Sequence, residues 1–249
     1  MALETRSDRS ADAGGILDKT AVRDAATVIV VRDAATSPRV LMGQRGALAA
    51  FMPNRFVFPG GALDQGDRTV PLAAPLPEPC ASRLEEQSAP GLGPGLAAAA
   101  VRELWEETGL MLGRPGRWPG EAPEDWRGFA EAGLLPAADG LSFVFRAITP
   151  PGRPRRFDAR FFLTDADVLA GDPDDFSQAS DELSHLQWIG LDQVRDFHLP
   201  FITEVVLAEI AAALPRIGPP QTVPFFDNGA EESLFRRLGG VGPMAAGRA

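Results

Sequence analysis

Apolar and β-branched residues fall into short runs near the start of the chain. Residues 25–32 (Ala-Ala-Thr-Val-Ile-Val-Val-Arg) form one such run, and its length and composition predict a buried strand. Residues 39–45 and 55–59 predict two further strands. The third run leads directly into Gly60 and Gly61. Paired glycines of this kind allow the backbone to approach a ligand or a packed helix closely.

The clearest helical pattern lies between Leu96 and Gly109. Ala97, Val101 and Leu104 form an apolar stripe at helical spacing. Gly109 is a natural C-terminal cap because glycine adopts the left-handed conformation without strain. We therefore predict an amphipathic helix over residues 96–109.

The later part of the chain repeats this alternation of strands and helices. The predicted elements are a helix at 123–132, strands at 141–148, 156–163 and 183–189, and a helix at 201–214. The whole order is strands, helix, strands, helix. This order favours an α+β sandwich over alternating strand–helix–strand units.

Composition shifts divide the chain into segments. Residues 1–22 are polar, and we expect a disordered N-terminal segment. Residues 23–214 hold the predicted elements and form one domain. Within it, residues 66–95 are so rich in proline and glycine that they predict an irregular insertion. Residues 215–249 form a C-terminal extension, with a short amphipathic piece at 231–238.

The charge balance narrows the range of partners. The chain has 24 basic and 34 acidic residues, which gives a net charge of −10. Nucleic-acid binding needs a basic surface, so we expect no nucleic-acid partner. Small anionic substrates fit this balance, because a divalent metal held by carboxylates inverts the local charge.

Cysteine content and hydropathy suggest a compartment. A single cysteine, Cys80, excludes an intrachain disulfide and a thiolate metal cluster, as is typical of a reducing cytoplasm. The first ten residues lack the apolar core of a signal peptide. No apolar run approaches the ~18 residues of a membrane span. We expect a cytoplasmic protein without a membrane partner.

Three glutamates carry the candidate chemistry. Glu103, Glu106 and Glu107 are three and four positions apart on the predicted helix, so they share one face. Neighbouring carboxylates repel one another and raise each other's pKa values. A hard divalent cation relieves this repulsion, and ligation by oxygen alone favours Mg²⁺ or Mn²⁺. Arg102 precedes Glu106 by four positions and can hold that carboxylate in place.

An acidic structural module is the alternative interpretation, because helices with several glutamates are often simply solvated. Two features favour a site instead. The opposite side of the helix is apolar, so the helix is packed and only one face is wet. The glycine pair that follows Phe58-Pro59 lies upstream, and the two features together are more specific than either one.

These residues resemble the Nudix box. Gly61, five residues, Asp67, and then Arg102-Glu103-Leu104-Trp105-Glu106-Glu107-Thr108-Gly109-Leu110 follow the family pattern of Gly, five residues, Glu, seven residues and Arg-Glu-apolar-x-Glu-Glu-x-Gly-apolar. The resemblance implies a Nudix-type α/β/α sandwich with a mixed central sheet. It also implies a hydrolase that uses Mg²⁺ or Mn²⁺ to cleave a diphosphate linkage.

The resemblance also implies roles for individual residues. Glu103, Glu106 and Glu107 would be metal ligands, with Asp67 at the position of the family's first Glu. The pattern places Arg102 as the residue that orients Glu106. Gly61 would lie in the loop under the metal site.

One departure from the pattern points to a branch of the family. Between Asp67 and Arg102 there are 34 residues, where the family pattern has seven. A long insertion at this point resembles the branch of peroxisomal-type coenzyme A diphosphatases. The resemblance implies coenzyme A or acyl-coenzyme A as a substrate, and ADP-ribose or NADH-type compounds are the alternative. A catalytically weak ligand sensor on the same fold is a further alternative.

Residues outside the box complete the candidate site. Glu182 precedes the 183–189 strand and is a candidate proton acceptor, although a solvated loop acid explains it equally well. Arg45 and Arg156 are candidates for binding substrate phosphates, because arginine grips phosphate in a bidentate manner. The expected partner is a small nucleotide-diphosphate substrate. By analogy with the family, a homodimer is also expected.

Overall fold

The computed structural model describes residues 21–47, 49, 52–230 and 232–239. The disordered segment predicted for residues 1–22 lies almost entirely outside the described residues. Val22 already belongs to the first strand of the sheet.

The centre of the fold is a mixed sheet built around β1 (Val22–Arg32). This strand runs parallel to β8 (Arg156–Asp165) and antiparallel to β2 (Arg39–Arg45). Next to β8 lies β7 (Ser142–Ile148), and next to β2 lies β9 (Leu183–Gly190), both antiparallel to their neighbours. The mixed sheet predicted from the sequence is therefore confirmed.

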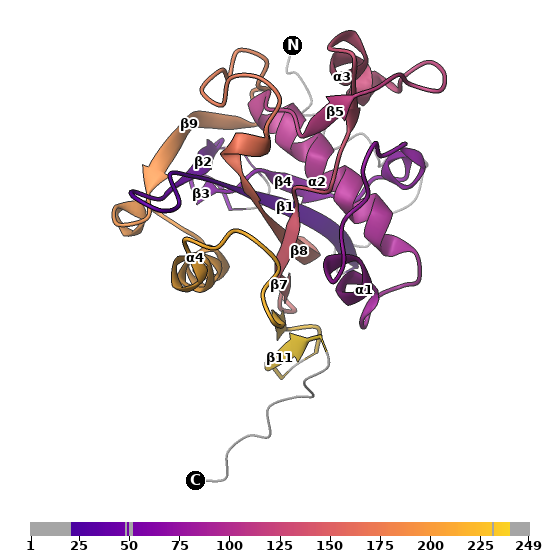
Figure 1. Cartoon of the computed structure of the whole chain (residues 1–249). Helices are drawn as coiled ribbons and strands as arrows, with labels where there is room; N and C mark the ends of the chain where they lie inside the picture. The colour runs from indigo at the N-terminus through magenta and orange to yellow at the C-terminus, as the bar shows by residue number, and fades with distance from the viewer. Residues whose placement is uncertain (1–20, 48, 50–51, 231, 240–249) are drawn as a thin grey trace.

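Helices cover both faces of this sheet. The long helix α2 (Leu92–Thr108) lies on one face, and α4 (Phe201–Ala213) lies on the other (Figure 1). The remaining elements are β3 (Phe56–Val57), β4 (Gly60–Ala62), α1 (Cys80–Glu85), β5 (Gly113–Pro115), α3 (Arg127–Glu131), β6 (Leu134–Pro136), β10 (Val223–Asp227), β11 (Leu234–Leu238), and the 3-10 turns Gly66–Thr69, Glu124–Trp126, Ala166–Val168 and Val194–Asp196.

The alternation along β1 separates two hydrophobic cores. Val28 and Val30 pack in the core that includes the apolar residues of α2. Ile29 and Val31 pack in the second core, with the apolar residues of α4. All four side chains are fully buried. Because successive side chains of a strand point to opposite faces, a strand this apolar needs cover on both sides.

The insertion is more regular than its composition predicts. It contains the short helix α1, and α2 begins at Leu92, four residues earlier than expected. Gly91, with φ 72°, precedes the helix, and proline is tolerated in a first turn because its missing N–H has no helical partner there. Gly95 packs closely on the turn before the insertion helix, since a Cβ atom there would lie 3.2 Å from the Cγ of Arg68.

The predicted strand at 55–59 is shorter in the structure, where β3 covers only Phe56–Val57, and a second strand, β4, follows it. β3 pairs with β2, whereas β4 consists of the glycine pair and Ala62, and it pairs with β1. Gly61 was expected in a loop under the metal site. It lies in a strand instead, where two residues without side chains fit closely beside β1.

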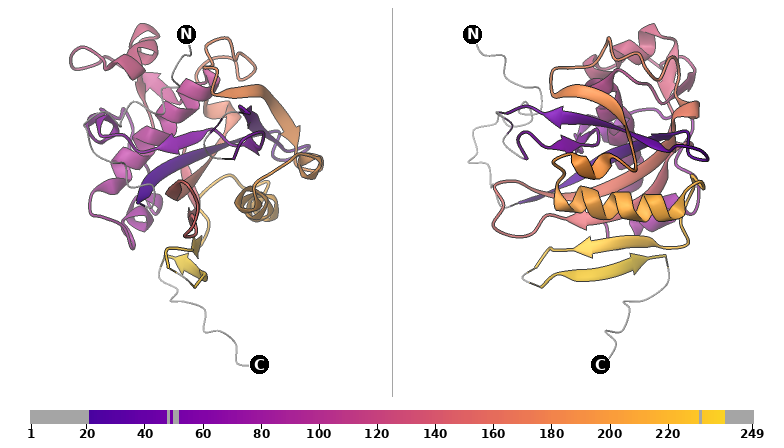
Figure 2. Two further views of the ribbon diagram at one scale, coloured as in Figure 1. Left: turned by 180° about the vertical axis from the view of Figure 1, so that it is seen from behind. Right: turned by 90° about the vertical axis from the view of Figure 1, so that its left-hand side faces the viewer.

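The C-terminal residues extend the sheet, so the predicted domain boundary at 214 is wrong. β10 runs parallel to β7, and β11 pairs antiparallel with β10 to form a hairpin below α4 (Figure 2). The piece at 231–238 was expected to be an amphipathic segment outside the domain. It contains β11, whose last residue, Leu238, is fully buried.

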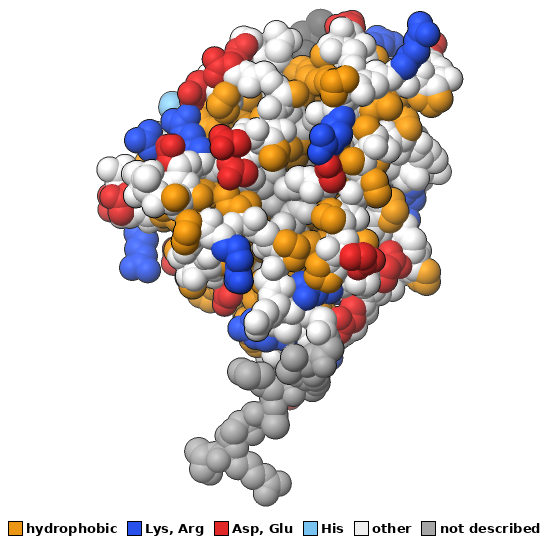
Figure 3. Space-filling model, viewed as in Figure 1, with side chains coloured by type: hydrophobic (Ala, Val, Ile, Leu, Met, Phe, Trp, Pro, Cys, Tyr) orange, Lys and Arg blue, Asp and Glu red, His pale blue; other side chains and the backbone are white. Residues whose placement is uncertain are grey.

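The surface carries a mixture of charges. On the face seen in Figure 3, basic and acidic side chains alternate among apolar ones, and the described residues there form no extended basic patch. In the described part of the chain, no helix is long and apolar enough to cross a membrane.

If the hairpin belongs to the core, Phe225→Ala should lower the free energy of unfolding by about 3–5 kcal/mol. Phe225 is 2% exposed, and the guanidinium of Arg146 lies 4.3 Å from its ring centroid. Urea denaturation followed by circular dichroism measures the change. Phe235→Ala is the control, because Phe235 is 43% exposed on the neighbouring strand. Equal and small losses in both variants would contradict a core role for the hairpin.

Candidate active site

The glycine strand β4 brings the backbone against the end of α2. The backbone N–H of Gly60 donates a hydrogen bond of 2.7 Å to Oε2 of Glu107. Gly61 faces Glu103 so closely that a Cβ atom at this position would overlap with the Glu103 carboxylate. Gly61 is therefore needed for the close approach of Glu103, whereas Gly60 is needed for the close approach of β4 to Ala26 and Thr27 of β1.

A buried guanidinium organises the acidic cluster. Nε and Nη2 of Arg102 donate to the two carboxylate oxygens of Asp67, at 2.9 and 3.0 Å. Nη1 donates to Oε1 of Glu103 and to Oε2 of Glu106, both at 2.9 Å, and Nη2 also donates to the carbonyl of Ala62 at 3.0 Å. The predicted contact of Arg102 with Glu106 is present, together with three contacts that were not predicted.

The geometry gives Asp67 a positioning role in place of the predicted role as a metal ligand. Asp67 is 2% exposed, and Arg102 occupies both of its oxygens. One of these oxygens also accepts from the backbone N–H of Asp64, at 2.8 Å. With its acceptors used in this way, Asp67 fixes the guanidinium and the loop that precedes the insertion.

Burial makes ionisation of two of the glutamates unfavourable. Burial raises the pKa of Glu103 to about 8 against the opposing effect of Arg102, and the neighbouring Glu106 adds to the rise. Burial also raises the pKa of Glu107 well above its ordinary value, and the charge of Glu103 adds to this rise, while Arg45 opposes it. The positive charges of Arg102 and Arg45 are therefore not enough to stabilise these carboxylates in their ionised form.

This donor set fits a divalent metal ion by its chemistry and its charge. Glu103, Glu106 and Glu107 offer only oxygen, which Mg²⁺ and Mn²⁺ prefer. The positive charge of Arg102 is already balanced by Asp67. The negative charges of the three glutamates are therefore not fully neutralised by Arg102. Within the described residues, no three Asp, Glu, His or Cys side chains already converge as a metal site would require. The fit therefore rests on the nature of the donors and the excess of negative charge.

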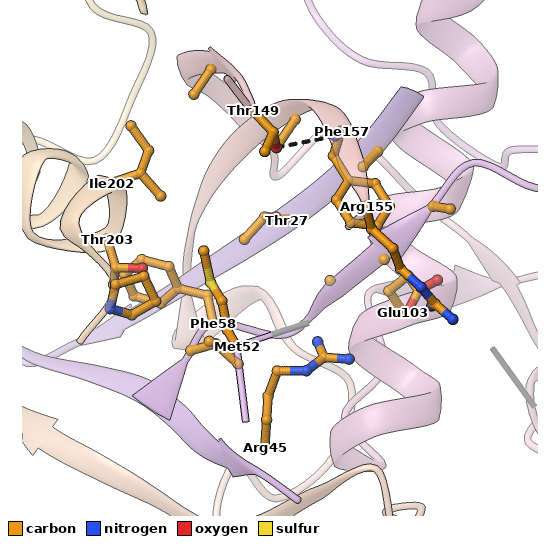
Figure 4. A pocket seen from close by; sticks show the side chains of 18 of the residues that line it. Thr27, Arg45, Met52, Phe58, Glu103, Thr149, Arg155, Phe157, Ile202 and Thr203 are labelled. Atoms are coloured by element: carbon orange, nitrogen blue, oxygen red, sulfur yellow. Dashed lines mark hydrogen bonds between the residues drawn. The ribbon is translucent and has the colours of Figure 1, made fainter. Parts of the chain in front are cut away.

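The glutamates line a large cleft with two other predicted residues. The cleft has a volume of about 1570 Å³, and Glu103, Glu106 and Glu107 lie along it with Arg45 and Glu182. Arg45 points toward the helix glutamates from the end of β2 (Figure 4). Glu182 is close enough to raise the pKa values of Glu103 and Glu107. The structure thus brings together residues that are far apart in the sequence.

Arg156 does not belong to this site, contrary to the prediction. Its Nε donates to the carbonyl of Thr149 at 3.0 Å, and its Nη2 donates to that of Gly229 at 3.2 Å, so it joins the segments that follow β7 and β10. Its neighbours Arg153 and Arg155 line the cleft instead. Strand alternation points Phe157 and Ala159 of β8 toward the cleft and Arg156 away from it, whereas Arg153 and Arg155 reach the cleft from the loop before β8.

Arg55 is a cleft residue that the sequence analysis did not single out. It lines the cleft just before β3, and its Nη1 donates to the carbonyl of Leu199 at 3.3 Å. No motif marks this position. Its role becomes visible only when the loop before α4 is placed beside β3.

Comparison with known proteins gives two informative similarities. No family model matches the chain. Over 179 residues the chain is 32% identical to a Caenorhabditis elegans protein named "Putative nudix hydrolase 7", a match that covers 67% of this chain and 51% of that protein. The crystal structure of a NUDIX hydrolase from Alicyclobacillus acidocaldarius is similar with a TM-score of 0.59 and 27% identity, covering 78% of this chain and 92% of the other.

The chain belongs to the Nudix superfamily. The predicted α+β fold with a Nudix-type sandwich is therefore confirmed. The chain spans about half the length of the Caenorhabditis elegans relative.

The Nudix box closes despite its insertion because the insertion is tied down along its length. Arg83 of α1 donates to the carbonyls of Pro220 and Gln221, at 2.6 and 2.7 Å. Arg146 of β7 donates to the carbonyls of Glu86 and Gln87, at 3.2 and 3.0 Å. The insertion thus forms part of the folded domain, and its two ends bring Asp67 and Arg102 together.

The Asp67–Arg102 pair should contribute strongly to stability. Asp67→Asn removes the charge at constant size and leaves a buried guanidinium with an incomplete partner, which should cost about 3 kcal/mol in the free energy of unfolding. Asp64→Asn is the matched control, because the Asp64 side chain is 48% exposed and lies 3.9 Å from the same guanidinium. Urea unfolding of both variants measures the difference. Similar losses would mean that the buried pair is not the organising contact.

Proposed function

We propose that this chain is a divalent-metal-dependent hydrolase that cleaves the diphosphate linkage of a nucleoside-diphosphate-linked small molecule. The observation that carries the proposal is the set of three helix glutamates at a large cleft, two of which are held against a glycine strand. Membership of the Nudix superfamily supports the reaction class. About half of the Caenorhabditis elegans relative has no counterpart in this chain. The activity is therefore tested on this chain itself.

In this proposal the carboxylates of α2 divide the work. Glu103 and Glu107 would hold Mg²⁺ or Mn²⁺, and Glu106 would be either a third ligand or an acceptor of the proton from water. A bound divalent ion supplies charge neutralisation on the phosphoryl oxygens and a more acidic water. Arg102 keeps Glu103 and Glu106 in position through its two short contacts.

Two cleft residues complete the proposed machinery. Glu182 faces the same carboxylates from the segment before β9 and can accept the proton of the attacking water. Arg45 extends into the cleft from β2, where its charge can bind the diphosphate oxygens. The two residues lie close together, because Arg45 is the pairing partner of Leu183, the residue that follows Glu182.

The finer substrate assignment rests on the sequence resemblance. The long insertion supports coenzyme A or acyl-coenzyme A, whose hydrolysis would release 3′,5′-ADP and a phosphopantetheine. ADP-ribose and NADH-type compounds are the second class to test. A ligand sensor without turnover is the outcome that would replace the enzyme proposal.

Purified protein with Mg²⁺ should hydrolyse at least one member of a panel of coenzyme A, acetyl-coenzyme A, NADH, ADP-ribose and diadenosine polyphosphates. Glu107→Gln should lower kcat by about 100-fold or more, because it removes a charged group of the proposed ion site. Glu209→Gln, on the exposed side of α4, should leave kcat unchanged. Mass spectrometry of the products identifies the bond cleaved. Turnover that survives in Glu107→Gln would remove Glu107 from the mechanism.

Metal binding should be visible without any substrate. At ten times its dissociation constant, Mg²⁺ or Mn²⁺ should raise the Tm by about 3–6 °C, because the ion binds only the folded chain. Differential scanning calorimetry with and without the ion measures the shift, and a chelator should reverse it. Glu103→Gln should reduce the shift, while Glu209→Gln should not. A Tm that does not respond to either ion would argue against the proposed ion site.

A further inference from the structure

A row of small side chains crosses the sheet from the glutamate cluster toward the C-terminal hairpin. The pairing registers place Ala62 of β4 beside Ala25 of β1, Ala25 beside Ala159 of β8, and Ala159 beside Ala147 of β7. Phe226 of β10 is the partner of Ala147 and ends the row. All five residues line the same cleft as the glutamates. Four successive alanines thus form a flat floor across four strands.

Larger side chains stand on both sides of this floor. On one side, Thr27 pairs with Phe161, and Phe161 pairs with Phe145, whose ring meets it edge to face at 6.0 Å. On the other side lie Phe157 and Thr149, joined by hydrogen bonds of 2.8 and 3.1 Å. Figure 4 shows Thr27, Thr149 and Phe157 around the cleft. Alanines between higher walls form a trough.

The chemistry of the trough selects an apolar occupant. Alanine offers only a methyl group, and the strand N–H and C=O groups beneath it are directed to neighbouring strands. A sugar or a base laid on this floor would lose hydrogen bonds to water and could replace them only at the polar side chains of the walls, such as Thr27 and Arg155. An alkyl chain has no such bonds to lose and gains from burial.

The dimensions of the trough indicate an extended chain. From β4 to β10 there are four strand spacings, which correspond to about 19 Å. At the far end, Phe226 meets Phe201 of α4 with ring centroids 6.5 Å apart. The near end of the trough lies at β4. Among the described strands β4 pairs only with β1, so its other edge is open. The helix glutamates reach the cleft past this open edge of β4.

We propose that this trough is a binding subsite for an unbranched apolar chain on the half of the substrate that leaves with the second phosphate. The proposal rests on the proposed hydrolase activity, and it makes Ala25, Ala147, Ala159 and Phe226 specificity-determining residues. The reaction itself is hydrolysis. Water adds across one P–O bond of the diphosphate, and the products are a nucleoside monophosphate and a monophosphate that carries the chain.

A series of alkyl esters of ADP, from methyl to dodecyl, tests the subsite directly with Mg²⁺ present. Each ester would give AMP and an alkyl phosphate. In the wild-type protein, kcat/KM should rise by up to about fourfold for each added methylene group. The rise should stop where the chain reaches Phe226. A series in which methyl and decyl esters react equally well would overturn the proposal.

Ala159→Leu should block the middle of the trough. It should lower kcat/KM for the decyl ester by about tenfold or more and leave the methyl ester within about twofold, because only the long chain needs the floor. Ala212→Leu, on the exposed side of α4, is the control and should change neither. Phe226→Ala is the second variant, in which the trough is opened at its far end. It should shift the preferred chain to greater length, and an unchanged preference would count against the proposal.

Failure of the hydrolase and failure of the subsite can be distinguished. If neither the esters, including the methyl ester, nor any compound of the panel above is cleaved, the proposed activity fails. Calorimetric binding of methylene-bridged esters, which cannot be hydrolysed, then decides the subsite. Affinity that rises with chain length in the wild type, and not in Ala159→Leu, would support it. Affinity independent of chain length would overturn it.

Discussion

The buried guanidinium of Arg102 holds together three parts of the fold, which are β4, the start of the insertion and the acidic face of α2. It is 4% exposed, and it contacts Asp67 at the start of the insertion, the carbonyl of Ala62 in β4 and two glutamates of its own helix. A buried guanidinium without partners is very unfavourable. The groups that contact Arg102 must therefore all be in place for the folded state to be stable. The position of α2 relative to the glycine strand follows from these contacts. These contacts therefore fix the position of the acidic face of α2 relative to the cleft.

The insertion and the C-terminal hairpin support this arrangement from the far side. Arg83 joins the insertion to residues 220 and 221, and the N–H of Gly239 donates to Oε2 of Glu86 at 2.7 Å. Each segment alone is too small to bury a core of its own. Packed on each other and on the sheet, they form a continuous outer layer. This explains why 34 residues can separate Asp67 from Arg102 without loss of their contact.

Local patterns in the sequence predicted the fold and part of the site well, and the limits are physical. The strand at 39–45 and the Glu face of the helix depend on neighbours in the chain, and the resemblance supplied the glycine loop. By contrast, the role of Asp67 depends on the hydrogen-bond donors that its carboxylate oxygens contact in the folded structure. The spacing of residues in the sequence does not reveal these donors. The pairing of β10 with β7 joins segments about 80 residues apart, and no local period reports such a partner. Arg156 was chosen for charge alone, without regard to the face of its strand.

The alternation along β8 shows how one strand serves two purposes. Its even-numbered residues Asp158 and Arg160 lie in a buried polar network, in which Asp158 pairs with Arg146 at 2.7 Å and Arg160 donates to Oγ of Ser88 at 3.1 Å. That face locks the insertion onto the sheet. The odd-numbered residues Phe157 and Ala159 carry no charge and line the cleft. Since a shift of one residue would exchange the two faces, the ion pairs that hold the insertion also fix the register that places the alanine floor in the cleft.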